Sequence, residues 1–263
     1  MCNKAPANRR LVQTGAPREK LRLPVRWGLF EHPNVGWVMI DTGYMPAALS
    51  APDRSLGLRI YSVALRAQSH EAGQPEVILA RLGLGVADVA MVIVTHFHAD
   101  HVAGLHSFVN ARFVASGAAI AAVQARSYLG NMKRGVFGEL VPADFKARMV
   151  AIEDLAQAEA AGLQGGDIFG DGTVLAIPLA GHAEGHFGLL FSDQPRPFLY
   201  GVDPQWLMAA VTQNAPLGYP ARLIFDDYAA GLVSVARLRD FMAQGGDLAL
   251  CHDPAKMPYD GDA

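Results

Sequence analysis

Three histidines and one aspartate gather within six residues, in the motif His96-x-His98-x-Asp100-His101. The motif directly follows residues 89–94 (VAMVIV), an apolar and mostly β-branched run that is typical of a strand covered on both faces. Imidazoles and carboxylates are the ligands that Zn²⁺ and similar divalent ions prefer. His96 and His98, two residues apart, can point the same way, while Asp100 and His101 can turn to the other side. One loop can therefore supply ligands to two adjacent metal ions.

The composition indicates a folded protein rather than a disordered chain. Apolar residues make up 51% of the 263 residues and charged residues only 18%. The formal charge is 22 − 25 = −3, without the basic excess of a nucleic-acid-binding protein. No segment reaches the roughly 18 consecutive apolar residues of a membrane span. Two cysteines, Cys2 and Cys251, cannot form a disulfide framework, so we expect a cytoplasmic protein without nucleic-acid or membrane partners.

The chain divides into a basic N-terminal extension, residues 1–26, and one α/β domain, residues 27–263. The extension has seven Lys or Arg and one acid, and it lacks the apolar stretch of a signal peptide. In the domain, the apolar patterns predict two sheets with helices outside. The expected strands are 35–40, 89–94, 112–115, 173–178, 187–192, 197–202 and 248–251. The expected helices are 74–82, 118–125 and 234–244, with a loop at 46–58 and a helical, lid-like excursion at about 127–161.

Three later residues are suitable partners for the histidine-rich loop. His182, Asp203 and His252 each come shortly after an apolar run that we expect to be a strand. Strand ends at one edge of a sheet bring such side chains together. Each residue alone is more simply a capping or loop residue, but together with the cluster at 96–101 they indicate additional metal ligands.

The histidine-rich motif together with the later candidate ligands resembles the pattern of the metallo-β-lactamase superfamily. The resemblance extends from about residue 27 to residue 254. The resemblance implies a four-layer αββα sandwich in a single domain. It also implies two metal sites, with one ion on His96, His98 and His182, a second on Asp100, His101 and His252, and Asp203 bridging the two. In the same way it places Asp41, of Ile40-Asp41-Thr42-Gly43, behind the ligands, and it gives His186 a supporting role.

Such a site implies a binuclear metal-dependent hydrolase. Two divalent ions, Zn²⁺ in the first place with Mn, Co or Fe as alternatives, share a bridging hydroxide because they lower the pKa of water from 15.7 toward about 7. The hydroxide attacks an electrophilic carbonyl or phosphoryl centre. Asp100 is the expected catalytic residue, since it would both bind metal and orient the hydroxide.

Within the superfamily, the chain is most similar to the N-acyl homoserine lactonase and methyl parathion hydrolase-like group. Residues 31–36 (EHPNVG) resemble its N-terminal hairpin, and residues 251–253 (CHD) resemble its last ligand strand. Those lactonases carry a tyrosine near the bridging aspartate, whereas Asp203 is followed here by Pro204-Gln205-Trp206. We expect cleavage of a lactone or related ester. The alternatives are phosphotriesterase or β-lactamase activity on the same site, or a metal-binding module without turnover.

The substrate is expected to be a small molecule held beside the metals by Tyr128, Phe137 and Trp206. Aromatic side chains of this kind form apolar pocket walls. Packing of the excursion is an equally good interpretation for Tyr128 and Phe137, and packing is the favoured interpretation for Trp206 taken alone. Cys251 adjoins His252, and a buried thiol at a strand end is the favoured interpretation over a ligand. The resemblance also suggests a homodimer.

Overall fold

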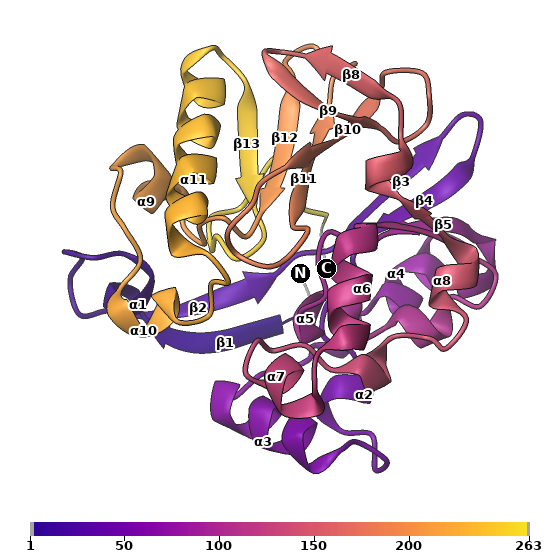
Figure 1. Ribbon diagram of the computed structural model, residues 1–263, viewed down its shortest axis with the longest axis horizontal. Helices are drawn as coiled ribbons and strands as arrows, with labels where there is room; N and C mark the ends of the chain where they lie inside the picture. Colours follow the sequence, from indigo (N-terminus) through magenta and orange to yellow (C-terminus); the bar gives the residue numbers. More distant parts are fainter. Residues whose placement is uncertain (1–2, 262–263) are drawn as a thin grey trace.

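Two β-sheets lie against one another in the computed structural model, which describes residues 3–261 and the side chains of residues 7–219 and 221–261 (Figure 1). One sheet has the order β3-β4-β5-β6-β7 and is parallel except for the β3–β4 hairpin. Its strands are β3 (Gly28–His32), β4 (Gly36–Ile40), β5 (Val89–Ile93), β6 (Arg112–Ala115) and β7 (Met149–Ala151).

The second sheet has the order β13-β12-β11-β10-β9-β8, with only β12 and β13 parallel. Its strands are β8 (Gln157–Ala160), β9 (Leu163–Asp167), β10 (Val174–Pro178), β11 (Phe187–Phe191), β12 (Phe198–Val202) and β13 (Asp247–Leu250). A separate hairpin joins β1 (Asn3–Asn8) and β2 (Lys20–Val25).

Alternating side chains of the second sheet build two hydrophobic cores. In β10, Val174 and Ala176 belong to the large core that also contains Val92 and Phe113 of the first sheet. Leu175, between them in sequence, belongs to a second core on the outer face, where Leu238 and Phe241 of a helix cover the sheet. Because successive strand residues point to opposite faces, this segregation places one core between the sheets and one outside.

Helices cover the outer faces, which completes a helix–sheet–sheet–helix arrangement. The long α11 packs on the second sheet, and Figure 1 shows α4, α6 and α8 on the side of the first sheet. The α-helices are α1 (Arg9–Val12), α2 (Pro46–Leu49), α3 (Leu56–Leu65), α4 (Pro75–Arg81), α5 (Ala99–Val102), α6 (Gly117–Ala125), α7 (Tyr128–Met132), α8 (Phe145–Arg148), α9 (Met208–Thr212), α10 (Tyr219–Arg222) and α11 (Tyr228–Ala243). The prediction of a single α/β domain with αββα layers is confirmed. Within residues 3–261, none of the helices has the length and apolar character that crossing a bilayer requires.

The structure corrects two local predictions. Residues 46–58, expected to be a loop, contain α2 and the start of α3, because Pro46 occupies a first helical position and the Ser55 hydroxyl caps α3. The excursion at 127–161 is helical only up to Arg148. Its remainder supplies β7 and β8, which are edge strands of the two sheets.

The N-terminal extension packs on the rest of the chain through a small core of its own. Val12 and Leu23 contact Leu207, Leu217 and Phe225, which belong to the segments around α9 and α10. Figure 1 shows the β1–β2 hairpin running below these helices and directing the end of β2 toward the middle of the molecule. Residues 24–26 therefore arrive between the two sheets, beside the loop that follows β13.

Candidate metal centre

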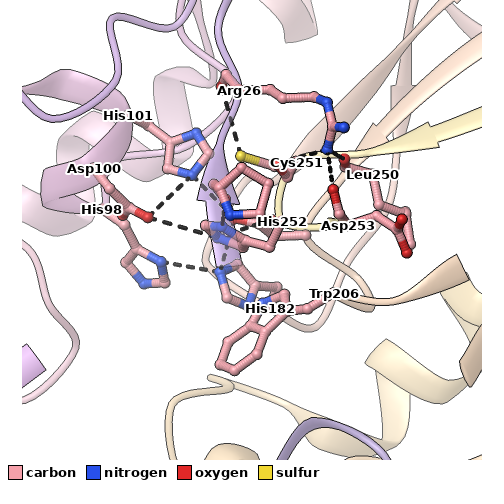
Figure 2. Close-up of polar contacts among 12 residues, drawn as sticks. Arg26, His98, Asp100, His101, His182, Trp206, Leu250, Cys251, His252 and Asp253 are labelled. Atoms are coloured by element: carbon pink, nitrogen blue, oxygen red, sulfur yellow. Dashed lines mark hydrogen bonds and ion pairs between the residues drawn. The ribbon is translucent and has the colours of Figure 1, made fainter. Parts of the chain in front are cut away.

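Strand ends bring the seven predicted ligand residues together. His96, His98, Asp100 and His101 follow β5, whereas His182, Asp203 and His252 follow β10, β12 and β13. All six side chains other than Asp100 belong to buried residues, and the Asp100 side chain is 14% exposed. The cluster is therefore an enclosed polar centre with Asp100 as its most accessible member, and Figure 2 shows several of these side chains converging.

The first group of donors consists of His96, His98 and His182. The Nδ1 atom of His98 lies 3.1 Å from Nε2 of His96 and 3.0 Å from Nε2 of His182. Nitrogens bound to one tetrahedral zinc at about 2.0–2.1 Å would stand roughly 3.3 Å apart, so this spacing fits a shared ion. Burial lowers the pKa of each of the three imidazoles, which favours the neutral form that binds metal.

The second group lies around His101 and His252. The Nε2 atom of His101 is 3.0 Å from Oδ2 of Asp203, and Nε2 of His252 is 3.4 Å from Oδ1 of the same carboxylate. Asp100 is slightly farther, with its Oδ2 3.8 Å from His101 Nε2 and 3.6 Å from His252 Nε2. His101 Nε2 and Asp203 Oδ1 are buried without a hydrogen-bond partner among the described residues. Unsatisfied buried donors and acceptors are costly, and a divalent ion between them would satisfy both.

Asp203 lies between the two groups. Besides its contacts with the second group, its Oδ2 is 3.6 Å from His96 Nε2 and 3.7 Å from His182 Nε2. Its direction is fixed by a bulge at the end of β12, where the pairing with β13 shifts and Val202 adopts a φ of 64°. A β-branched residue in the left-handed region is a strained conformation of the kind found at functional sites.

A polar contact on the far side of the His101 ring holds this candidate ligand in orientation. Asp41, whose φ is 54°, accepts hydrogen bonds from the Thr95 amide at 2.9 Å, the Thr95 hydroxyl at 2.8 Å and His101 Nδ1 at 2.8 Å. With its Nδ1–H donated to Asp41, the His101 ring turns Nε2 toward the centre. Such partners fix the tautomer and the direction of a metal-binding histidine.

His186 acts on Asp203 rather than on a metal. Its Nδ1 donates to the Leu179 carbonyl at 2.8 Å, and its Nε2 accepts the backbone N–H of Asp203 at 3.2 Å. Burial lowers the pKa of His186 to about 4, so the ring is neutral at physiological pH, as these two bonds require. Both nitrogens are thus occupied by these hydrogen bonds, and the supporting role of His186 stays a prediction.

Arg26 is a further site residue, and the sequence analysis did not single it out. Arg26 as a whole is only 7% exposed, and its guanidinium donates to backbone carbonyls of the turn after β13 (Figure 2). It also donates to the Asp260 carboxylate. The acceptors are the carbonyls of Leu250, Cys251, Asp253 and Ala255 and both carboxylate oxygens of Asp260. Two residues earlier, the Pro24 carbonyl accepts from His252 Nδ1 at 2.7 Å. The end of β2 therefore positions the last predicted ligand.

The three predicted substrate-binding aromatics lie in different surroundings. The Trp206 ring stands edge-on to His182 at 6.5 Å and to His252 at 5.7 Å, so it contacts one histidine of each donor group. Tyr128 is 45% exposed and shares a hydrogen bond with the Ser55 hydroxyl, and the fully buried Phe137 packs against Tyr61. Each of these two has a partner away from the histidines, and a substrate contact for either stays a prediction.

The excursion instead supports the ligand loop through its backbone. Val136 forms an isolated β-bridge with His98, and the Ala99 amide donates to the Gly135 carbonyl at 3.0 Å. A positive φ of 71° at Gly135 permits this close approach. The segment after α7 therefore fixes the backbone of the histidine motif.

The model of the metallo-β-lactamase superfamily matches residues 22–201, more than half of the chain. The chain belongs to this superfamily. As a metallo-β-lactamase superfamily member with a buried histidine and aspartate cluster, it is a metal-dependent hydrolase, and the predicted resemblance is confirmed.

The relatives include lactonases. The chain is 26% identical over 242 residues to the N-acyl homoserine lactonase AttM of Azorhizobium caulinodans, covering 90% of this chain and 84% of the relative. Among solved structures it is similar to a variant of AiiA from B. thuringiensis with N-decanoyl-L-homoserine bound at the active site. That likeness has a TM-score of 0.66 at 19% identity, over 96% of this chain and 90% of the other. A probable metal-dependent hydrolase from Staphylococcus aureus is similar with a TM-score of 0.71 at 18% identity, over 96% of this chain and 86% of the other. At these identities the structural likenesses describe the fold.

Proposed function

We propose that this metallo-β-lactamase superfamily member is a binuclear hydrolase that opens the ring of N-acyl lactones. The observation that carries the proposal is the position of Asp203, whose carboxylate lies 3.0–3.7 Å from histidine nitrogens of both donor groups. A carboxylate shared in this way suits two adjacent divalent ions. His96, His98 and His182 would hold one ion, and His101, His252 and Asp100 would hold the other, with zinc first among the metals that accept such ligands.

Two ions held by these residues would supply Lewis acidity, which activates water for attack and polarises a substrate carbonyl. The chain contributes the remaining functions. In this proposal Asp100, whose side chain is 14% exposed, would accept a proton from the attacking water and orient the nucleophile, and its proximity to His101 and His252 supports this role. Asp41 and the Pro24 carbonyl keep the imidazoles of His101 and His252 in the tautomer that presents Nε2.

Trp206 supports a substrate with an apolar part. Its indole lies against one histidine of each group and offers a flat apolar surface next to the reacting centre. The indole N–H is buried and has no hydrogen-bond partner among the described residues, so a substrate oxygen that reached it would satisfy this donor. The AttM relatives are N-acyl homoserine lactonases, which supports an acylated lactone as the substrate class.

The test is a hydrolysis panel on protein reconstituted with Zn²⁺, Co²⁺ or Mn²⁺, with metal content measured on the same samples. The panel contains N-acyl homoserine lactones of varied chain length, aryl esters, a phosphotriester and nitrocefin. We expect about two ions per chain and lactone cleavage as the fastest reaction. Fewer than one ion per chain after reconstitution, or a panel without any cleavage, would exclude the proposal.

Two histidine variants test whether the metal is bound by the first donor group. His182→Ala removes one donor of the first group, whereas His106→Ala changes an exposed histidine whose Nε2 lies 3.1 Å from the Glu139 carbonyl oxygen. We expect His182→Ala to lower the metal content toward one ion and the lactonase rate by at least about 100-fold, since one site is broken. His106→Ala should match the wild type in both metal content and lactonase rate.

The homodimer that the family resemblance suggests stays a prediction.

A further inference from the structure

The thiol of Cys251 lies within ligand distance of the second donor group. Its Sγ atom and the donor atoms of His101, Asp203 and His252 all lie within 4.8 Å of one another. Asp100 is not a member of that mutually close set. Figure 2 shows the sulfur on the same side of the turn as the His252 ring.

The thiol lies where the large hydrophobic core meets the polar centre. Cys251 is fully buried and belongs to that core, and its sulfur also lies close to two imidazoles and a carboxylate. The thiol donates a weak hydrogen bond to the Arg26 carbonyl at 3.5 Å. Two atoms of the polar set, His101 Nε2 and Asp203 Oδ1, are buried without a hydrogen-bond partner among the described residues. A cation bound at these two atoms would have the sulfur nearby as a further ligand.

We propose that Cys251 is a thiolate ligand of the ion held by His101, Asp203 and His252, an inference that rests on the metal site of the proposed function. On binding, the sulfur forms a bond to the metal, the thiol proton leaves to solvent, and no atom is oxidised or reduced. The Arg26 carbonyl, which loses the S–H donor, keeps the hydroxyl of Tyr200 at 3.3 Å. Deprotonation therefore leaves no backbone acceptor unsatisfied.

A thiolate changes which metal the second site prefers. Sulfur is a soft ligand that selects Zn²⁺ and disfavours Mn²⁺, whereas a site of imidazoles and carboxylates alone accepts both more evenly. The second site should therefore bind Zn²⁺ in preference to Mn²⁺, and this selectivity should depend on Cys251.

The test is the absorption spectrum of the protein loaded with Co²⁺. The wild type should show cobalt d–d bands in the visible and, in addition, a sulfur-to-cobalt charge-transfer band in the near ultraviolet. Cys251→Ser should keep the d–d bands, lose the charge-transfer band and bind Zn²⁺ at the second site at least about tenfold more weakly. Cys2→Ser is the matched control, since it removes the other cysteine of the chain and should retain the band.

The outcomes separate the thiolate from the metal site itself. Two bound cobalt ions without a charge-transfer band would overturn the Cys251 ligand and leave the proposed function intact, whereas failure to bind cobalt would remove both. X-ray absorption at the zinc edge of the wild-type protein needs no variant. A sulfur scatterer at about 2.3 Å is expected, and a shell of only nitrogen and oxygen would overturn the proposal.

Discussion

Replacing Arg26 by leucine tests whether a single buried guanidinium holds the turn that carries His252. The substitution removes six hydrogen bonds, between 2.5 and 3.3 Å long, to four backbone carbonyls and to Asp260. The side chains of Arg26 and Asp260 are each only 8% exposed, so solvent replaces these bonds poorly. Removing one partner of a buried ion pair costs about 3–5 kcal/mol.

We therefore expect Arg26→Leu to lower the free energy of unfolding by about 3–5 kcal/mol, a large part of the 5–15 kcal/mol typical of a domain. Arg26→Lys keeps the charge but has three donors without the planar fork, so about 1–3 kcal/mol should be lost. The measurement is urea unfolding followed by tryptophan fluorescence, with a chelator present so that metal binding does not contribute. A loss below about 1 kcal/mol for Arg26→Leu would refute the assigned role.

Metal titration supplies a second readout that general destabilisation does not produce. Because the turn carries His252, Arg26→Leu should weaken binding of the ion at His101 and His252 by about 10–100-fold, as for other supporting contacts of metal ligands. Binding at His96, His98 and His182 should be unchanged. Equal weakening of both ions would contradict the specific link between Arg26 and His252.

Three further predictions follow from other contacts. Asp41→Asn should weaken metal binding at His101 by about 10–100-fold, because Asp41 fixes that ring, and unchanged affinity in a competition titration would exclude this. Burial raises the pKa of Asp260, but the hydrogen bond and charge of Arg26 outweigh it and hold that pKa below its usual value. The ionised carboxylate thus stabilises the fold above about pH 4 and this contribution is lost as the pH falls further, so urea midpoints between pH 3 and pH 6 should decline less in Asp260→Asn than in the wild type. Trp206→Phe keeps an aromatic surface but removes the indole N–H, and we expect lactonase kcat/KM to fall about 5–30-fold with unchanged metal content, whereas wild-type kinetics would show that the N–H contacts no substrate.

The sequence predicted those parts of the fold and site that depend on local pattern. Strands such as 89–94 and 112–115 have continuous apolar runs, and the motif at 96–101 is compact enough to be recognised without a structure. The excursion at about 127–161 was predicted to be helical from the mixed charges and apolar residues of its first part, but residues 149–160 contain two short edge strands. Edge strands are stabilised by pairing with a neighbour, which a local pattern does not reveal.

The role of Arg26 was missed for a similar reason. Its acceptors lie 224–234 residues farther along the chain, and the arginine stands in a basic segment where a solvated charge is the usual interpretation. A possible signal was its position at the end of an apolar strand pattern, 21–25 (LRLPV), where a buried arginine would need carbonyl or carboxylate partners. The interpretation of Cys251 as a buried thiol at a strand end is confirmed, but its closeness to His101 and Asp203 depends on segments far away in the sequence and could not be predicted from local pattern.

The bond from His252 to the Pro24 carbonyl has a consequence for the order of folding. His252 reaches its observed orientation only when the turn after β13 has docked on the end of β2, 228 residues earlier in the sequence. The candidate ligand set is therefore assembled late, after two segments far apart in the sequence have met.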